Sequence, residues 1–368
     1  MKRTLLAVSI LLMFHIHCFA RELPNGPSGM PAREEVAFSS FEELHQYLLN
    51  KTVKNGFSGS VLVAKNGKPV FLKAYGLASK TSNIRNKVDT KFNLGSLSKL
   101  FTTVAIAQLM EKGKLSIDDP IGKYIDIFPK EIAGKVTIRH LLDMSSGWGD
   151  YWRNEYYVDH KDHLRTVSDY MAFIKDIPLD FEPGTKFRHC NIGYEVAGAV
   201  IEAISGMDYY GYVRKNIFEP SGMAATDSFY RDDPVENLAV GYTNMGPDGP
   251  VGKGYKHDNS AILPPRGTPA GGGYSTIVDL LKFEIALSAN KLLTPDYTNF
   301  LLNRFQGSPG DPGSLPQKIY QTRGMAPGVS TYLGMDPRFN YTIIVLSNYD
   351  TPVTMGVADG VIKMFGIE

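Results

Sequence analysis

The sequence contains little cysteine, no excess of charge of either sign and no hydrophobic run long enough to cross a bilayer. Two cysteines in 368 residues exclude a disulfide framework and any multi-cysteine zinc or iron–sulfur site. The 39 Lys and Arg residues nearly balance the 38 Asp and Glu residues, so the net charge of +1 gives no electrostatic basis for binding nucleic acid. The longest apolar run has about 10 residues, whereas a membrane-spanning helix needs about 20. We therefore expect neither a nucleic-acid partner nor a membrane span.

The composition is that of a folded globular protein. Hydrophobic residues make up 43% of the chain and charged residues 21%, which is far from the composition of a disordered chain. A chain of 368 residues can bury a large core, as one large domain or as two closely packed parts.

The N-terminus predicts export. Two basic residues after the initial Met precede the short apolar run, and small residues around Ala20 end the segment, as in a secretory signal peptide over residues 1–20. A lipid-modified Cys18 is disfavoured because residues 15–17 are neither aliphatic nor small. We expect a periplasmic or secreted protein with a flexible leader over 21–37 and one remaining cysteine, Cys190.

Hydrophobic periodicity predicts strands near both ends of the chain and helices between them. Asn66-Gly67, between two β-rich runs, is a strong hairpin signal, and the Gly- and Pro-rich segment 246–273 indicates a loop. The expected strands are 58–65, 69–75, 318–323, 328–336 and 341–348; the expected helices are 40–52, 97–112, 137–144, 166–175, 191–204, 208–216, 276–288 and 353–365.

This order indicates an α/β fold of the α+β type. We expect one antiparallel sheet made from the N- and C-terminal segments and flanked by helices, with a mostly helical subdomain beside it. The domain would cover 38–368, with its α/β part at about 38–95 and 290–368 and its helical part at about 96–289. A cleft is expected between the two parts.

Ser96 and Lys99 form the first chemically informative pair. They are three residues apart at the start of an expected helix, so their side chains share one face. Burial would lower the pKa of Lys99 and let its neutral amine accept the Ser96 proton, and the Ser96 N–H would help to hold an oxyanion. Taken alone, the same spacing more often describes a capping serine and an exposed lysine.

The sequence around this pair resembles the serine β-lactamase and penicillin-binding-protein superfamily, in particular its class C-like esterase and D-aminopeptidase branch. S-x-x-K is one of that group's signatures. Further segments resemble the family in order along the chain, over about residues 57–363: 115–121, 137–147, 181–184, 191–194, 269–276, 279–280 and 345–348. The resemblance implies a β-lactamase/transpeptidase-like fold and catalysis through an acyl-enzyme, without a metal or an organic cofactor.

The family's second motif, Tyr-x-Asn, differs in this chain. His189-Cys190-Asn191 stands at its place, so Asn191 is retained and His189 replaces the proton-relaying Tyr. An imidazole also accepts and donates protons near neutral pH, which would give Ser96 a base of the Ser–His kind. The alternative is that His189 fills the space and catalysis is impaired.

The third motif, Lys- or His-x-Gly on a cleft strand, differs as well. Aligned with the family, Thr322-Arg323-Gly324 occupies its place, so the basic first residue is replaced by Thr322. The resemblance implies that Gly324 permits close approach of the acyl group and that the Met325 N–H is the second oxyanion donor. Strand alternation directs Arg323 away from the Thr322 side, which favours a surface arginine over a substrate-carboxylate ligand.

Other chemistry-bearing residues are weaker candidates. Trp148, together with neighbouring aromatic residues, would line an acyl pocket or belong to the core. Cys190 is expected to be a small buried residue. His160 and His163 are too few ligands for a metal site, and residues 155–157 are expected to form a solvated loop.

The sequence as a whole predicts a serine hydrolase or acyltransferase with a small-molecule or peptide acyl substrate. Loss of the motif Tyr and of the basic third-motif residue argues against an efficient β-lactamase or D-Ala-D-Ala carboxypeptidase, and favours an esterase or acyl-transfer activity on a less anionic substrate. The alternative is a catalytically impaired relative that acts as a binding protein.

Overall fold

The computed structural model describes residues 34–246, 249–250, 254–255, 257–306, 309, 319–338 and 340–366. The expected signal peptide and residues 21–33 of the expected leader lie outside these residues. Among the residues that are described, no helix has both the length and the apolar character needed to cross a membrane.

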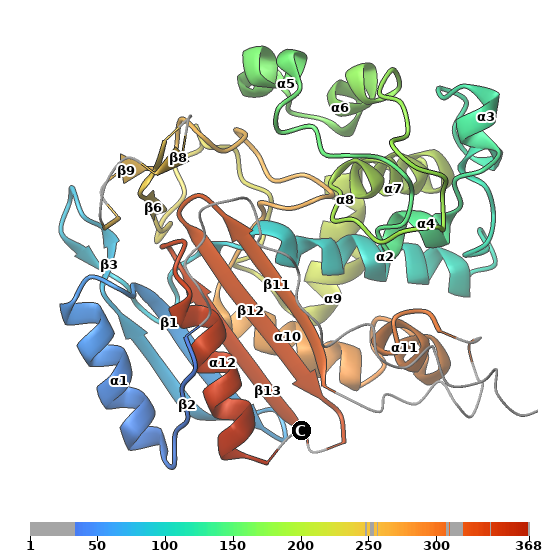
Figure 1. Cartoon of the computed structure of the whole chain (residues 1–368). Coiled ribbons are helices and arrows are strands. Elements are labelled where there is room, and N and C mark those ends of the chain that lie inside the picture. Colours follow the sequence, from blue (N-terminus) through green and yellow to red (C-terminus); the bar gives the residue numbers. More distant parts are fainter. Residues whose placement is uncertain are drawn as a thin grey trace, which may run out of the picture. The chain divides into compact units, whose positions relative to one another are not determined.

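A five-stranded antiparallel sheet joins the two ends of the described chain (Figure 1). Its strand order is β11-β12-β13-β1-β2, so the C-terminal strand β13 pairs directly with the N-terminal strand β1. This confirms the sheet expected from the sequence. The strands are β1 (Gly59–Lys65), β2 (Lys68–Tyr75), β11 (Tyr320–Ala326), β12 (Val329–Asp336) and β13 (Tyr341–Ser347).

The turn between β1 and β2 is the hairpin expected at Asn66-Gly67. Both residues have positive φ, 52° for Asn66 and 69° for Gly67. A two-residue turn of this handedness matches the twist of the paired strands, and Asn and Gly are the residues that adopt it at least cost.

Helices cover both faces of the sheet. Alternate residues such as Val61 and Val345 pack under α1 (Phe41–Val53) and α12 (Val353–Met364), whereas Leu62 and Leu346 belong to the larger core on the other side. In Figure 1 the helix α10 (Ile277–Ser288) lies behind the sheet, opposite α1 and α12. The apolar run in β13 is therefore buried on both faces, as its composition indicates.

The helical part is built around α2 (Lys99–Glu111), in which every residue from Lys99 to Met110 is buried. The helices α7 (Ile192–Ser205), α8 (Tyr209–Val213) and α11 (Pro295–Leu302) pack against it. A 3₁₀ turn, η1 (Gly95–Ser98), leads into α2. The remaining helical elements are α3 (Lys130–Ala133), α4 (Ile138–Leu142), α5 (Glu155–His160), α6 (Val167–Ile174), α9 (Glu219–Ser221), the 3₁₀ turns η2 (Ile121–Lys123) and η3 (Lys161–His163), and the π turn η4 (Arg214–Phe218).

Four short strand pairs tie loops together, and one of them positions the site. The strand β5 (Phe92–Asn93), just before η1, pairs with β10 (Tyr274–Ser275), just before α10. This pairing sets the segment around residue 271 against η1. The other pairs are β3 (Leu77–Ser79) with β4 (Ile84–Arg85), β6 (Tyr242–Thr243) with β9 (His257–Asp258), and β7 (Met245–Gly246) with β8 (Gly249–Pro250).

Three expectations differ from the structure. Residues 155–157 are not a solvated loop, because the Asn154 side chain caps α5 and Tyr157 is buried. The strand expected at 318–323 extends to Ala326, although its first residue lies outside the described ranges. The helix α10 packs against β1 and β13, so the chain returns to the α/β part before residue 290.

Candidate active site

Ser96 lies in η1, one turn before the start of α2. Gly95 precedes it with φ of 53°, a left-handed conformation that favours glycine. Gly272 donates a backbone hydrogen bond to Gly95 O over 3.1 Å, which holds the turn against the loop before β10. The turn therefore presents Ser96 at a fixed place between the helical part and the sheet.

Lys99 is the buried partner of Ser96. Lys99 is the first residue of α2 and is 4% exposed. Its Nζ lies 3.1 Å from Ser96 Oγ. It also donates to Asn191 Oδ1 over 2.6 Å and to Ala270 O. Burial lowers the pKa of Lys99 to about 8, against the opposing effects of Asp150, Glu195 and Cys190. An amine with this pKa exchanges a proton with a hydroxyl at near-neutral pH far more readily than an exposed lysine does.

Asn191 connects the pair to a carboxylate that sequence reasoning missed. It stands at the N-cap position of α7, and its Nδ2 donates to Asp150 Oδ2 over 2.9 Å. Burial raises the pKa of Asp150, and the bond from Asn191 and the charge of Lys99 lower it. Asp150 thus fixes the Asn191 amide so that its oxygen, not its nitrogen, faces the Lys99 ammonium. Asp150 lies in the segment 145–165 that carries several aromatic residues, but no motif marks it.

His189 lies at the mouth of the site and does not hydrogen-bond to Ser96 among the described residues. Its side chain is half exposed, and its Nδ1 is 3.8 Å from Asp150 Oδ2. The surrounding protein atoms, Lys99 and Arg323 lower the pKa of His189 to about 4, so the imidazole is neutral at pH 7. The structure brings Ser96, Lys99 and Asn191 together, whereas His189 is near Lys99 but is not bound to the nucleophile.

The third-motif strand runs along the free edge of the sheet beside η1. A Cβ added to Gly324 would lie 1.9 Å from Leu94 O, so the strand approaches the turn this closely only with glycine here. Thr331, on the neighbouring strand β12, donates to Leu94 O over 2.7 Å and ties the residue before η1 to the sheet. Thr322 shares the Gly324 side of the strand, and Arg323 is exposed on the other side.

The Met325 N–H lies on the side of β11 that faces η1. Arg304 donates to Gln321 O over 2.8 Å, which shows that the backbone groups of Gln321 face away from β12. In an antiparallel strand the same direction repeats every second residue, so the N–H of Met325 also faces away from β12. A Cβ on Gly95 would lie 3.1 Å from Met325 N, which places this N–H against η1.

For Trp148 the sequence left two alternatives, a pocket wall or the core, and the structure places it in the core. It is 1% exposed, its ring contacts Phe128 with centroids 5.2 Å apart, and its indole N–H donates to Ile177 O. It therefore belongs to the core. Cys190 is also buried, as expected, and burial raises its pKa to about 11.

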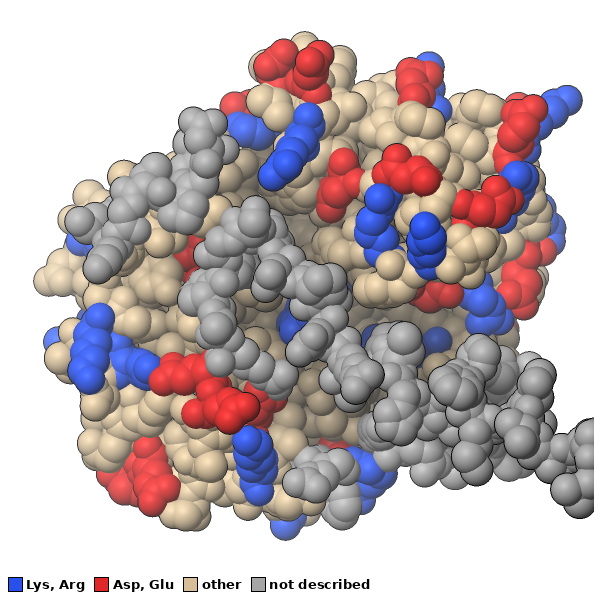
Figure 2. All heavy atoms as spheres, in the orientation of Figure 1, with Lys and Arg blue, Asp and Glu red and all other residues tan. Residues whose placement is uncertain are grey.

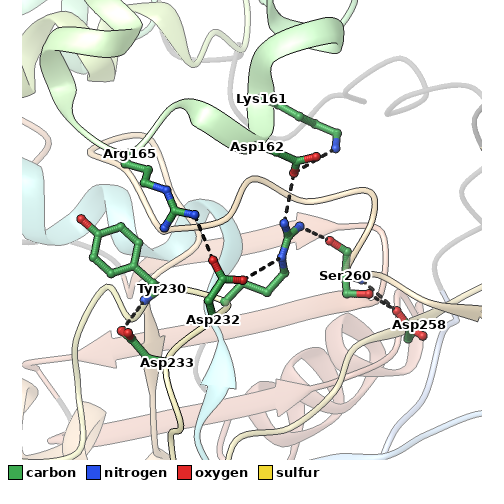
Figure 3. A network of polar contacts seen from close by, with 9 residues as sticks. Lys161, Asp162, Arg165, Tyr230, Asp232, Asp233, Asp258 and Ser260 are labelled. Carbon is green, nitrogen blue, oxygen red and sulfur yellow. Dashed lines mark hydrogen bonds and ion pairs between the residues drawn. The ribbon is translucent and has the colours of Figure 1, made fainter.

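Charged side chains connect three segments of the chain, around residues 160, 230 and 260 (Figure 3). Arg231 contacts Asp162 of η3 at 3.2 Å and donates to Ser260 O, and Arg165 pairs with Asp232 at 2.9 Å. These side chains are largely exposed, so each ion pair stabilises the fold by well under about 1 kcal/mol. The contacts fix the relative position of segments around 160, 230 and 260. On the face drawn in Figure 2, acidic and basic side chains are interspersed over much of the visible described surface.

The described residues contain no group of three His, Cys, Asp or Glu side chains that could hold a metal ion. A sequence model of the Beta-lactamase family matches residues 49–363, which is most of the chain. The chain belongs to the Beta-lactamase family. Members and structural neighbours of this family are serine hydrolases, and the described fold is the β-lactamase/transpeptidase fold.

Relatives of this Beta-lactamase family chain include penicillin-binding proteins. A putative penicillin-binding protein, PbpX, from Bacillus subtilis (strain 168) is 27% identical over 88% of this chain and 80% of its own length. The solved structure of a penicillin binding protein from Bacillus halodurans is 31% identical, with a TM-score of 0.73 over 87% of this chain and 98% of that chain. A D-amino acid amidase from Ochrobactrum anthropi SV3, at 21% identity, shares the fold with a TM-score of 0.72 over 88% of this chain and 99% of that chain.

Proposed function

We propose that this chain is a serine hydrolase that acts on an ester or amide through an acyl-enzyme formed on Ser96. The observation that carries the proposal is the 3.1 Å contact between Ser96 Oγ and the buried Lys99 Nζ. A serine hydroxyl is a weak nucleophile unless a base takes its proton, and here the base is already in hydrogen-bond contact. No metal and no organic cofactor enters the proposed reaction.

In the proposed first step, Ser96 Oγ attacks the substrate carbonyl carbon while its proton passes to the neutral Lys99 amine. Asn191 Oδ1 and Ala270 O then hold the resulting ammonium. The carbonyl oxygen becomes an oxyanion that receives hydrogen bonds from the N–H groups of Ser96 and Met325. In other serine hydrolases, removal of one such preorganised donor costs about 3 to 4 kcal/mol of transition-state stabilisation.

His189 is proposed to serve the leaving group. As the tetrahedral intermediate breaks, the alcohol or amine must gain a proton, and the neutral imidazole at the mouth of the site can pass one from the Lys99 ammonium. With a pKa of about 4, His189 is a poor base for Ser96 itself. Water or a second alcohol or amine then attacks the acyl-enzyme and releases Ser96.

The proposed substrate is an ester or amide without a strong anionic anchor. Thr322 occupies the place of the basic third-motif residue and cannot form an ion pair with a substrate carboxylate. This argues against efficient β-lactamase or D-Ala-D-Ala carboxypeptidase activity. Among proteins that share the fold, a D-amino acid amidase and EstCE1, described as a hydrolase with promiscuous acyltransferase activity, fit this substrate class.

A fluorophosphonate probe tests the proposal. We expect it to label the wild-type protein on Ser96, to leave Ser96→Ala unlabelled, and to label Ser98→Ala at the wild-type rate. Ser98 is a matched control because it lies in the same turn, is buried, and its Oγ has no hydrogen-bond partner among the described residues. An unlabelled wild type would favour the alternative, a binding protein that retains the cleft but not the reaction.

We also infer that the protein is exported to the periplasm or secreted. Support comes from the basic and apolar pattern of residues 1–20. N-terminal sequencing of the protein isolated from its native host should begin at Arg21. Recovery of the chain with Met1 intact in the cytosol would contradict export without affecting the proposed chemistry.

A further inference from the structure

Glu195 is a buried carboxyl group that the proposed reaction does not use. It lies in the first turn of α7, one turn after Asn191, and is 0% exposed. Its Oε1 accepts from Thr268 over 2.6 Å and from Tyr151 over 2.9 Å, while no described residue donates to its Oε2. Burying a carboxyl with one oxygen unpaired is costly, so packing alone does not explain a glutamate here.

Two short paths connect Glu195 to Lys99. In the first, Thr268 Oγ1 donates to Glu195 and accepts from the Ala270 N–H over 3.2 Å, and Ala270 O accepts from Lys99. In the second, the Glu195 N–H donates to Asn191 O over 3.1 Å, and Asn191 Oδ1 accepts from Lys99. The Glu195 carboxyl group is therefore linked to Ala270 O through Thr268, whereas the second path is a backbone bond of α7, and the Asn191 side-chain amide is held by Asp150.

The loop between Thr268 and Gly271 is held by hydrogen bonds within itself and to α2 and α7. Its ends exchange two backbone hydrogen bonds, Thr268 N to Gly271 O and the reverse. Pro269 O accepts from Thr102 over 2.7 Å, one turn along α2 from Lys99. The side-chain bond from Thr268 to Glu195 ties this loop to α7, so it sets how far Ala270 O stands from Lys99.

On this basis, which rests on the proposed function, we propose that Glu195 is the positioning residue for Lys99. Its carboxyl group holds the Thr268–Ala270 turn against α7 so that Ala270 O faces the amine. Its negative charge, together with that of Asp150, also favours the ammonium form of Lys99, so loss of this charge should lower the pH above which Lys99 acts as a base.

The electrostatic surroundings agree with this role. Burial raises the pKa of Glu195 to about 7, and the charge of Lys99 acts in the opposite direction. The titratable groups around Glu195 come from every neighbouring element: Lys99 on α2, Asp150 and Tyr151 after α4, Tyr157 on α5, Tyr170 on α6, and Tyr209 and Tyr210 on α8. Lys99 is the cation in this set, and the phenols are neutral at working pH.

The variant Glu195→Gln separates charge from shape. Glutamine keeps an oxygen that accepts from Thr268 and Tyr151 but carries no charge, so the neutral amine of Lys99 should persist to lower pH. We expect the rising limb of the fluorophosphonate labelling rate to move down by about one pH unit, the scale of one charge at short range. The labelling rate on the high-pH plateau should change by a smaller factor than the labelling rate within the rising limb.

Glu202→Gln is the matched control. Glu202 lies two turns further along α7, and its carboxylate accepts from the Tyr209 N–H over 2.8 Å, a bond that glutamine also accepts. Its limb should superimpose on the wild-type limb. A Glu195→Gln limb that also superimposes on the wild type would overturn the proposal, because a purely structural role predicts that result.

A second pair of variants serves if Glu195→Gln fails to fold. Thr268→Val removes the hydroxyl that joins Glu195 to the loop, and we expect labelling at least about tenfold slower at every pH, whereas Thr268→Ser should restore it. Wild-type labelling by Thr268→Val would refute the positioning role. A wild-type protein that is not labelled on Ser96 at any pH would instead refute the proposed function, and the role of Glu195 with it.

Discussion

The pH dependence of acylation follows from the pKa of Lys99. The amine must be neutral to take the Ser96 proton, and burial lowers its pKa to about 8. At pH 7 only about one molecule in ten then carries the neutral amine, and at pH 6 about one in a hundred. The rate kcat/KM should therefore rise about tenfold from pH 7 to its plateau above pH 9.

The assay is hydrolysis of a p-nitrophenyl acyl ester between pH 6 and pH 9.5, corrected for spontaneous hydrolysis. The variant Asp150→Asn removes a negative charge that raises the pKa of Lys99 but keeps an oxygen that can accept from Asn191. Its rising limb should lie about half a unit to one unit lower than that of the wild type. Asp118→Asn is the control, because Asp118 is exposed and pairs with Arg139 on α4.

The reasoning fails if the wild-type rate is flat between pH 6 and pH 9. A flat profile would mean that the essential base titrates well below pH 6, as His189 does with its pKa of about 4. Lys99 would then be a structural cation, and the proton of Ser96 would pass to the imidazole.

Three further outcomes are expected. His189→Ala should lower the rate of ester hydrolysis by about 10²- to 10⁴-fold and lower it less for esters with better leaving groups; equal losses for all esters would remove His189 from proton transfer to the leaving group. Gly324→Ala should lower Tm by several degrees and the labelling rate at least about tenfold, because its Cβ would lie 1.9 Å from Leu94 O; unchanged values of both would show that β11 does not approach η1 this closely. Cys190 should resist iodoacetamide in the folded protein at pH 8 and react in guanidinium, as read by peptide mass spectrometry; rapid labelling of the folded protein would contradict its burial and its pKa of about 11.

Much of the fold was readable because its signals are local. Asn66-Gly67 marks the first hairpin, and the continuous apolar run of β13 marks a strand covered on both faces. The error at residues 155–157 has a local cause too: their polar and aromatic composition hides a short helix that depends on the Asn154 cap and on burial of Tyr157. Strand β11 was placed too early because Gly324 and the following Pro327-Gly328 turn resemble loop residues.

The site was readable only where residues are close in sequence or match a motif. Ser96 and Lys99 are three residues apart, and Asn191 belongs to a recognisable motif. Ala270 is 171 residues from Lys99, and its contribution is a backbone oxygen, which leaves no mark in the sequence. Asp150 and Glu195 act through Asn191 and Thr268, so only the folded arrangement reveals them. The position of His189 relative to Ser96 depends on the path of one extended segment, which periodicity does not specify.

The most direct test of the central claim is to trap the acyl-enzyme. The protein is mixed with an excess of a p-nitrophenyl acyl ester, quenched in acid within the first turnover, digested and analysed by mass spectrometry. The account predicts the mass of the acyl group on the peptide that contains Ser96, with the modification on Ser96 itself and with none on the same peptide of Lys99→Met. Turnover of the ester with no acyl group on Ser96, or with the acyl group on another residue, would contradict it.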